Sequence, residues 1–128
     1  MAIKFHNPPN VPLAGKYSHG AEVPLGARLL YVSGQVGIGS NGKLQPTFEK
    51  QAVQAWKNIG QVLKAAGMSY KDIVKITSFI TDGRYLLANR AARDQFIKEP
   101  YPAATLLVVA GLADPAMLVE IEVVAAKG

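Results

Sequence analysis

Residues 117–126 read MLVEIEVVAA, an apolar run interrupted by two carboxylates, Glu120 and Glu122. In a β-strand, successive side chains point to opposite faces, so this stretch has two distinct sides. One predicted side is wholly apolar and holds Val119, Ile121, Val123 and Ala125. The other side holds Leu118, Glu120, Glu122 and Val124. We expect the first side to lie in a hydrophobic core and the second to meet water, a partner subunit or a functional site.

The length and composition are typical of a globular protein. The chain has 128 residues, of which 49% are hydrophobic and 18% are charged, and this predicts a single domain over residues 1–128. No run approaches the roughly 18–20 apolar residues that a membrane-spanning helix needs. Residues 1–9, MAIKFHNPP, lack the apolar segment of a signal peptide. The sequence therefore predicts a cytoplasmic protein with no membrane partner.

Several kinds of site are excluded or disfavoured by the residue types present. The chain has no cysteine, which excludes disulfides, thiolate catalysis and cysteine metal ligands. Its two histidines, His6 and His19, lack the H-x-x-x-H spacing of a metal site, so no metal is expected.

The net charge of +5 permits binding to nucleic acid but does not by itself indicate it. Lys50, Lys57 and Lys64 recur every seven residues and would form one stripe on a helix. We interpret this stripe as a solvated outer face rather than an RNA-binding surface. No nucleic-acid partner is therefore expected.

Hydrophobic periodicity and turn residues predict the element order β-β-β-α-β-α-β-β. The six predicted strands are a short edge strand within residues 1–16, followed by Ser18–Val23, Ala27–Ser33, Ile73–Thr81, Thr105–Ala110 and Leu118–Ala126. The first helix follows an N-cap at Thr47 and ends near Ala66, with Gly67 as its C-cap. The second helix spans roughly Arg84–Lys98, where Glu99 and Pro100 stop it.

Each predicted helix has a single apolar stripe, which indicates how it packs. Trp56 belongs to the stripe of the first helix, and we expect it in the core. The predicted inner face of the second helix comprises Leu87, Ala88, Ala91, Ala92 and Phe96. A surface ion pair is expected between Arg90 and Asp94. The sequence thus predicts an α+β fold in which both helices cover one face of a mixed sheet. The uncovered face, with Glu120 and Glu122, is a candidate surface for oligomer formation.

Short motifs occur in a characteristic order along nearly the whole chain. They are Gly15-Lys16-Tyr17-Ser18, Val32-Ser33-Gly34-Gln35-Val36, Gln51-Ala52-x-Gln54-Ala55-x-x-Asn58-Ile59, Leu63-x-Ala65-Ala66-Gly67, Asp72-Ile73-Val74-Lys75-Ile76-Thr77, Asn89, Tyr101-Pro102-Ala103 and Val119-Glu120-Ile121-Glu122. Taken together, this series resembles the reactive intermediate deaminase family (RidA or YjgF, also labelled L-PSP endoribonuclease). The resemblance implies a chorismate-mutase-like fold and a homotrimer whose sheets line a central barrel. It also implies small-molecule clefts between subunits, where imines and enamines are hydrolysed without metal or cofactor.

The same resemblance implies roles for individual residues. Glu120 matches a glutamate thought to activate water, and Tyr17 a tyrosine that closes the cleft. The other matching ligand-binding positions are Ser33, Gly34, Asn89, Ala104 and Leu106. Leu106 stands where members often have cysteine, and its backbone N–H is a candidate oxyanion donor.

Ala104 is the main departure from the family pattern. It stands where the family's Pro-Ala-Arg segment has an arginine that binds the substrate carboxylate. Lys16 and His19 also depart from the usual motif, and Lys16, His19 or Arg84 are candidates to supply the lost charge. We therefore expect weak or no activity on 2-imino acids.

Three functions stay open from the sequence. The first is hydrolysis of an imine, enamine or related small C–N metabolite, in the manner of a 2-iminobutanoate/2-iminopropanoate deaminase. The second is a non-catalytic trimer that binds a small molecule or a protein. The third is endoribonuclease activity, which the family's older label suggests and no histidine pair supports.

Overall fold

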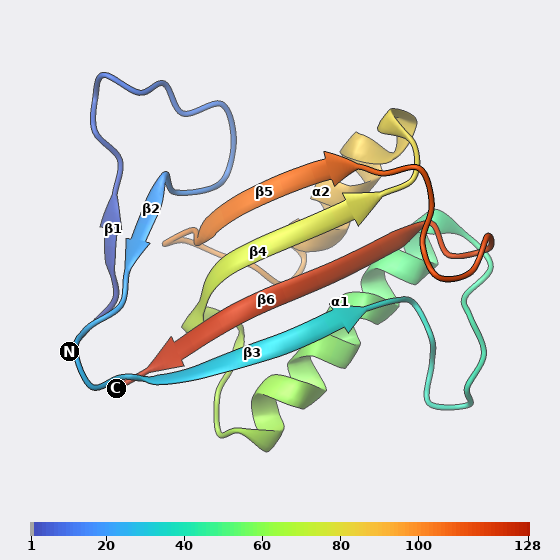
Figure 1. Ribbon diagram of the computed structural model, residues 1–128, viewed down its shortest axis with the longest axis horizontal. Coiled ribbons are helices and arrows are strands. Elements are labelled where there is room, and N and C mark those ends of the chain that lie inside the picture. The colour runs from blue at the N-terminus through green and yellow to red at the C-terminus, as the bar shows by residue number, and fades with distance from the viewer. Residues whose placement is uncertain (1) are drawn as a thin grey trace.

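The computed structural model describes residues 2–128 and contains a four-stranded mixed sheet with the order β3-β6-β4-β5. Its strands are β3 (Arg28–Gln35), β4 (Ile73–Ile80), β5 (Ala103–Val108) and β6 (Val119–Lys127). Strand β6 is antiparallel to both neighbours, whereas β4 and β5 are parallel. Figure 1 shows both helices behind this sheet. The predicted α+β fold, with helices on one sheet face, is therefore confirmed.

The N-terminal strands form a separate hairpin instead of extending the main sheet. Strand β1 (Lys4–His6) pairs with β2 (Gly20–Glu22), and the pair projects beside the sheet in Figure 1. A single bridge between Ser18 and Ala103 connects this region to β5. The prediction of a strand over Ser18–Val23 was too long. Ser18 pairs with Ala103 instead of β1, and its N–H donates to the Pro102 carbonyl at 3.0 Å, while the chain turns at Pro24–Ala27 before β3 begins.

Helix α1 (Phe48–Ala65) forms as the sequence predicts. The Thr47 side chain accepts a hydrogen bond from the Lys50 N–H at 3.2 Å, which confirms the N-cap. Gly67 follows the helix with a φ of +71°, a left-handed conformation that glycine adopts at little cost. Both ends of α1 were thus encoded locally.

Helix α2 (Leu86–Asp94) differs from the prediction in length and in rotation. A 3₁₀ turn (Gly83–Tyr85) precedes it, and it ends four residues before Lys98. Leu87 is 73% exposed, and Ala91 is also exposed, so neither belongs to the inner face as predicted. The buried residues of α2 are Ala92 and the polar Asn89. The prediction failed because it assigned only apolar residues to the inner face.

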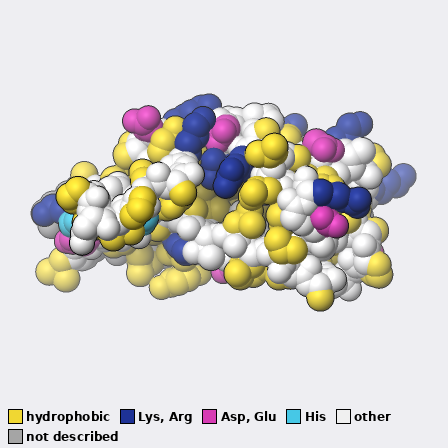
Figure 2. Space-filling model, turned by 90° about the horizontal axis from the view of Figure 1, so that it is seen from above, with side chains coloured by type: hydrophobic (Ala, Val, Ile, Leu, Met, Phe, Trp, Pro, Cys, Tyr) yellow, Lys and Arg dark blue, Asp and Glu magenta, His cyan; other side chains and the backbone are white. Residues whose placement is uncertain are grey.

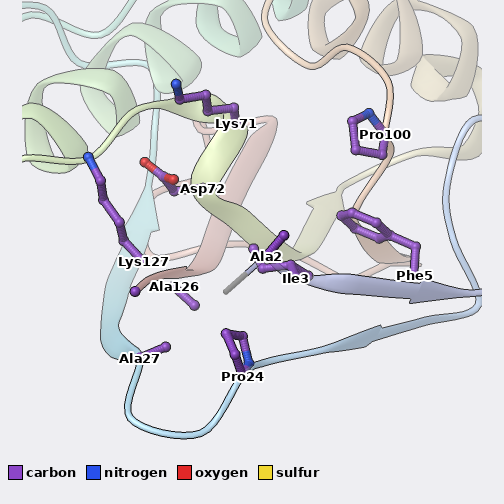
Figure 3. Close-up of a pocket in the computed structure, with 11 residues that line it drawn as sticks. Ala2, Ile3, Phe5, Pro24, Ala27, Lys71, Asp72, Pro100, Ala126 and Lys127 are labelled. Carbon is purple, nitrogen blue, oxygen red and sulfur yellow. The ribbon is translucent and has the colours of Figure 1, made fainter.

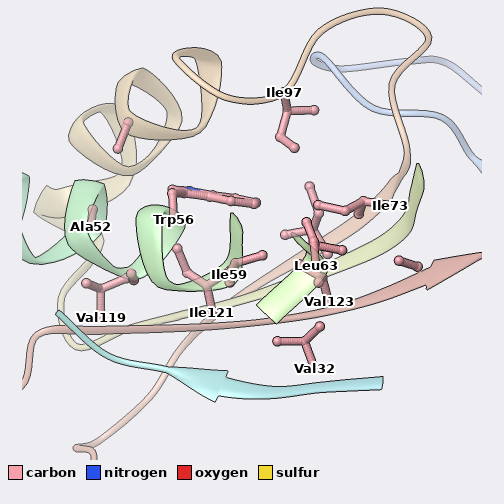
Figure 4. Close-up of a cluster of buried hydrophobic side chains, with 14 of the residues drawn as sticks. Val32, Ala52, Trp56, Ile59, Leu63, Ile73, Ile97, Val119, Ile121 and Val123 are labelled. Atoms are coloured by element: carbon pink, nitrogen blue, oxygen red, sulfur yellow. The ribbon is translucent and has the colours of Figure 1, made fainter. Parts of the chain in front are cut away.

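The core lies between α1 and the sheet. Figure 4 shows Ile59 of α1 near Ile121 of β6, whereas the Trp56 ring lies farther from β6, on the side of Ile97. The Trp56 ring stacks on Phe96, with 6.2 Å between the ring centroids. The residues predicted to form the inner side of β6 are at most 2% exposed, namely Val119, Ile121, Val123 and Ala125. Trp56 is 1% exposed, as predicted, and its backbone carbonyl accepts a hydrogen bond from the Tyr70 hydroxyl at 2.8 Å.

The opposite face of the main sheet has no helix against it (Figure 1). Glu122 and Val124 of β6 lie there opposite Thr77 and Tyr31, respectively. Tyr31 is 73% exposed, so a large aromatic side chain remains in solvent. No helix within residues 2–128 is long and apolar enough to cross a lipid bilayer.

Candidate active site

Glu120 and Gly34 come together on the open face of the sheet. Glu120 is the second residue of β6, and Gly34 lies near the end of the neighbouring strand β3. A Cβ atom added to Gly34 would lie only 2.8 Å from Cδ of Glu120 and closer still to its Oε2. Glycine at position 34 is therefore what allows the carboxylate to lie against the backbone of β3.

The Glu120 carboxylate is half-buried but has no protein partner within residues 2–128. Within residues 2–128 it makes no hydrogen bond or ion pair with another side chain or with the backbone. Ser33, which precedes Gly34, is exposed, and its carbonyl accepts a hydrogen bond from Gln35 Nε2 at 3.1 Å. Both oxygens of Glu120 thus remain free to bind water or a ligand, beside the Ser33–Gly34 corner that the sequence predicted.

Tyr17, Asn89, Ala104 and Leu106 form a second group around a pocket of about 130 Å³. The pocket lies between the edge strand β5, helix α2 and the loop before β2. The remaining lining comes from these elements and β4, with Gly15, Lys16, Ile76, Ser78, Leu86, Arg90, Arg93 and Thr105. Figure 2 looks onto this side of the molecule and shows Lys and Arg side chains gathered around its middle.

Asn89 is a polar group with an unmet hydrogen bond inside this pocket. The residue is 4% exposed, and its Oδ1 has no hydrogen-bond partner within residues 2–128. A buried acceptor left without a partner costs about 1–3 kcal/mol. Oδ1 itself is almost inaccessible to solvent, so the role of Asn89 in ligand binding stays a prediction.

The two groups lie on opposite faces of the sheet, because Ala104 and Leu106 pair with the buried Ile76 and Ser78 on the helix-covered face, whereas Glu120 lies on the open face. One row of paired residues crosses the sheet from Gln35 through Ile121 and Ser78 to Leu106. Three strand spacings separate the ends of this row, a distance of about 14 Å. Glu120 itself lies on β6, two strand spacings or about 10 Å from β5. Because it also faces the open side of the sheet, a single chain does not bring Glu120 and Ala104 into one cleft.

Comparison with known proteins identifies the family. The family model described as Endoribonuclease L-PSP matches residues 9–127. The 2-iminobutanoate/2-iminopropanoate deaminase of Mus musculus is 35% identical over 116 residues, covering 89% of this chain and 82% of the relative. The chain belongs to the RidA/YjgF family. The resemblance stated from the sequence motifs is thereby confirmed.

Solved RidA-family structures confirm the fold. The Rid family protein YyfB of Yersinia pestis aligns with a TM-score of 0.89 and 29% identity, covering 99% of this chain and 100% of that chain. Escherichia coli TdcF, solved with bound serine, aligns with a TM-score of 0.74 and 31% identity, covering 91% of each chain.

Three cations line the pocket of this RidA-family chain, and sequence reasoning named only Lys16 among them as a candidate. The other two are Arg90 and Arg93 of α2. Arg90 follows Leu86 by four residues, and Arg93 follows Asn89 by four and Arg90 by three, which places both arginines on one side of a helix. That spacing was the available signal, and no family motif includes it.

The predicted pair between Arg90 and Asp94 does not form. Asp94 instead contacts Arg93, whose Nη2 lies 3.0 Å from Oδ1, and Lys16, whose Nζ lies 3.4 Å from Oδ2. Desolvation opposes ionisation of Asp94, but hydrogen bonds and charges from Arg93 and Lys16 outweigh it and lower its pKa. Asp94 is therefore ionised at neutral pH.

Two other predicted substitutes for the missing arginine lie outside the pocket. Arg84 has a side chain that is 72% exposed and contacts Asp82 and the Tyr85 ring. His19 Nε2 lies 3.2 Å from the carbonyl oxygens of Val11 and Pro12, and its ring packs edge-on against Tyr17. His19 thus supports the loop that carries Tyr17, whereas Arg84 has no role in the pocket.

A larger pocket of about 300 Å³ lies between the β1–β2 hairpin and the end of the main sheet (Figure 3). It contains none of the predicted site residues. Asp72, in its wall, accepts a hydrogen bond from the Ser69 N–H at 2.8 Å. This carboxylate caps the short 3₁₀ helix (Tyr70–Asp72) and has a structural role.

Proposed function

We propose that this RidA-family protein is a cofactor-independent hydrolase of an imine, enamine or related small C–N metabolite. The observation that carries the proposal is the Glu120 carboxylate, free of protein partners and lying against Gly34. The family names of its relatives support the reaction class, since the mouse relative is named as an imine deaminase.

In the proposed reaction Glu120 acts as a general base. It accepts a proton from a water whose oxygen attacks the imine carbon, and the C=N bond becomes a C–N single bond. Glu120 then delivers this proton to the nitrogen, which gives a carbinolamine. Transfer of the hydroxyl proton to the amino nitrogen follows, the C=O bond forms, and the C–N bond breaks as its electron pair leaves with ammonia. One imine and one water thus give one carbonyl compound and one ammonia. The exposed Ser33 hydroxyl and backbone N–H groups near Leu106 are candidate donors to the ligand.

The complete site is proposed to lie between subunits of a homotrimer. One chain would supply Ser33 and Gly34 from β3 and Glu120 from β6, and its neighbour would supply the pocket at its β5 edge. The position of Glu120 and the pocket on opposite faces of one chain's sheet supports this arrangement. The open face, with exposed Tyr31 and Leu29, supplies apolar surface for such an assembly.

Ala104 sets the expected substrate range. A hydrogen bond to a charged group contributes about 1.5–3 kcal/mol, so losing the β5 arginine weakens binding of short 2-imino acids at that position. Turnover of 2-iminopropanoate is therefore expected to be weak beside that of an arginine-bearing relative. Equal turnover, measured as ammonia release, would refute this substrate assignment.

The strand that carries Glu120 also offers a matched control for the mechanism. Glu120→Gln keeps the side-chain shape but removes the base, and we expect a loss of about 10²–10⁴-fold in turnover. Glu122→Gln removes the same charge two residues along the same face and should leave turnover unchanged. Ammonia release across a panel of imines and enamines measures both variants. Full activity of Glu120→Gln would eliminate the proposed mechanism.

A non-catalytic small-molecule binder is the second candidate function. The unpartnered Oδ1 of Asn89 favours it, because that group requires a ligand or water but no chemistry. TdcF, a structural relative, was solved with bound serine. This alternative predicts ligand-induced thermal stabilisation without turnover of any imine in the panel.

A further inference from the structure

The pocket beside Ala104 carries an excess of positive charge. Lys16, Arg90 and Arg93 line it, and the only carboxylate in contact with these cations within residues 2–128 is Asp94. The Arg93 side chain is only 16% exposed, so its guanidinium is the most shielded of the charges. A shielded cation interacts with an anion more strongly than one in open solvent.

Asp94 shows how these cations hold a carboxylate. Both Nε and Nη2 of Arg93 donate to its Oδ1, at 3.3 and 3.0 Å. Lys16 Nζ donates to the other oxygen, Oδ2, at 3.4 Å. One carboxylate is thus bound by two cations from different elements, α2 and the loop before β2. The remaining N–H groups of Arg93 and the whole of Arg90 stay available for a second anion.

The same pocket has room and polar groups for a ligand. Ala104 ends at Cβ, so the volume that a longer side chain on β5 would fill is open. Ser78 and Asn89 line the pocket as buried polar residues, and Asn89 Oδ1 has no partner within residues 2–128. A site with three cations at its wall and open volume beside Ala104 matches a small anion, whereas Asn89 Oδ1 is an acceptor and would be satisfied by a water rather than by the anion.

We propose that this pocket binds a small carboxylate through Arg93, with Lys16 and Arg90, so that cations of α2 and the preceding loop replace a β5 cation. The inference rests on the proposed function only for placing this pocket in the reactive cleft. The ligand's carboxylate would lie against α2 rather than over Ala104. The pocket could then bind a short acid without turning over the corresponding 2-imino acid. A carboxylate held against α2 would also shift the reacting carbon away from the position it takes when a β5 cation holds the carboxylate.

The test is a binding titration that requires no turnover. The probes are 2-oxobutanoate, the product expected from 2-iminobutanoate, and its neutral amide, followed by calorimetry on the full-length protein. Arg93→Gln should weaken 2-oxobutanoate binding at least about tenfold, since one charged hydrogen-bonding partner is lost. Arg84→Gln is the matched control, because Arg84 is an arginine outside the pocket, and it should change the affinity less than about twofold. The amide should bind the wild-type protein more weakly than the acid.

Each contrary outcome overturns the inference. These outcomes are no binding of 2-oxobutanoate at millimolar concentrations, equal binding of the amide, or an unchanged affinity in Arg93→Gln. If Arg93→Gln does not fold, Lys16→Gln on the exposed loop replaces it, with severalfold weaker binding expected. Glu120→Gln separates this inference from the proposed function. That variant should lose turnover and keep 2-oxobutanoate binding, so failure of the hydrolase mechanism leaves the binding result intact.

Discussion

The Glu120–Gly34 group and the Ala104 pocket differ in how the chain builds them. Glu120 and Gly34 meet because two adjacent strands pair, and strand alternation alone placed Glu120 on the open face. The pocket instead combines α2, β4, β5 and the loop before β2, which meet only in the folded chain. The position of Glu120 can therefore be predicted from local sequence. The charges around the pocket depend on tertiary contacts and cannot be predicted in this way.

The largest change in activity is expected in a subunit-complementation experiment, which tests whether the two regions act together. Glu120→Gln and Asn89→Leu each disable one half of the proposed cleft, so in the proposed homotrimer each variant alone should be inactive. Unfolding and refolding them together at equal amounts should restore about a quarter of wild-type activity. In a ring, about one interface in four joins two intact halves. The recovered activity should exceed that of either parent by about tenfold or more.

The controls for complementation concern assembly. Light scattering should show trimers for both parent variants and for the refolded mixture. A mixture of the two variants made without unfolding should stay inactive as long as their subunits do not exchange. Activity that never rises above that of the parents, in demonstrably mixed trimers, would place both halves of the site in one chain. The comparison between the two regions would then lose its functional meaning.

The sequence predicted most of the fold because its signals were local. Thr47 and Gly67 mark the ends of α1, and the alternation in β6 separates the buried Val119 from the half-buried Glu120. The hairpin was harder, since the choice of β1 rather than β3 as the partner of β2 depends on where the chain turns at Pro24. Local pattern does not specify that partner.

The candidate site was predictable only in part. Family motifs placed Tyr17, Asn89, Ala104 and Leu106, and the structure brings these four together. Arg93 was missed because α2 was assigned an inner face that included the exposed Leu87. Rotating the helix so that Asn89 faces inward also places Arg93 at the pocket. A buried polar residue on an amphipathic helix was thus the decisive feature, and a purely apolar criterion overlooks it.

Ala104→Arg tests whether the pocket differs from an arginine-bearing site by this one position. We expect 2-iminopropanoate turnover to rise about tenfold, because the new guanidinium provides a bidentate partner for the carboxylate on β5. Ala104→Gln is the control for added size without charge, and it should give no gain. The nearby Arg93 opposes a fourth cation, so Ala104→Arg combined with Arg93→Gln should gain more than Ala104→Arg alone. Ammonia release measures all three variants, and an unchanged rate in both arginine variants would show that the cleft lacks more than a cation.

Asp94→Asn is expected to have the smallest effect and the opposite sign to Arg93→Gln. Asp94 occupies hydrogen-bond donors of Arg93 and Lys16, so removing its charge should strengthen 2-oxobutanoate binding by about two- to fivefold. Added salt should reduce this gain. The Asp94 pKa is lowered in the folded protein. The small stability that Asp94 contributes is consequently present at neutral pH and is lost as the pH falls through the folded-state pKa. Thermal unfolding of Asp94→Asn should therefore show a smaller loss of stability at low pH than the wild-type protein does. In the binding experiment, weaker 2-oxobutanoate binding by Asp94→Asn would mean that Asp94 orients Arg93 for the ligand rather than competing with it.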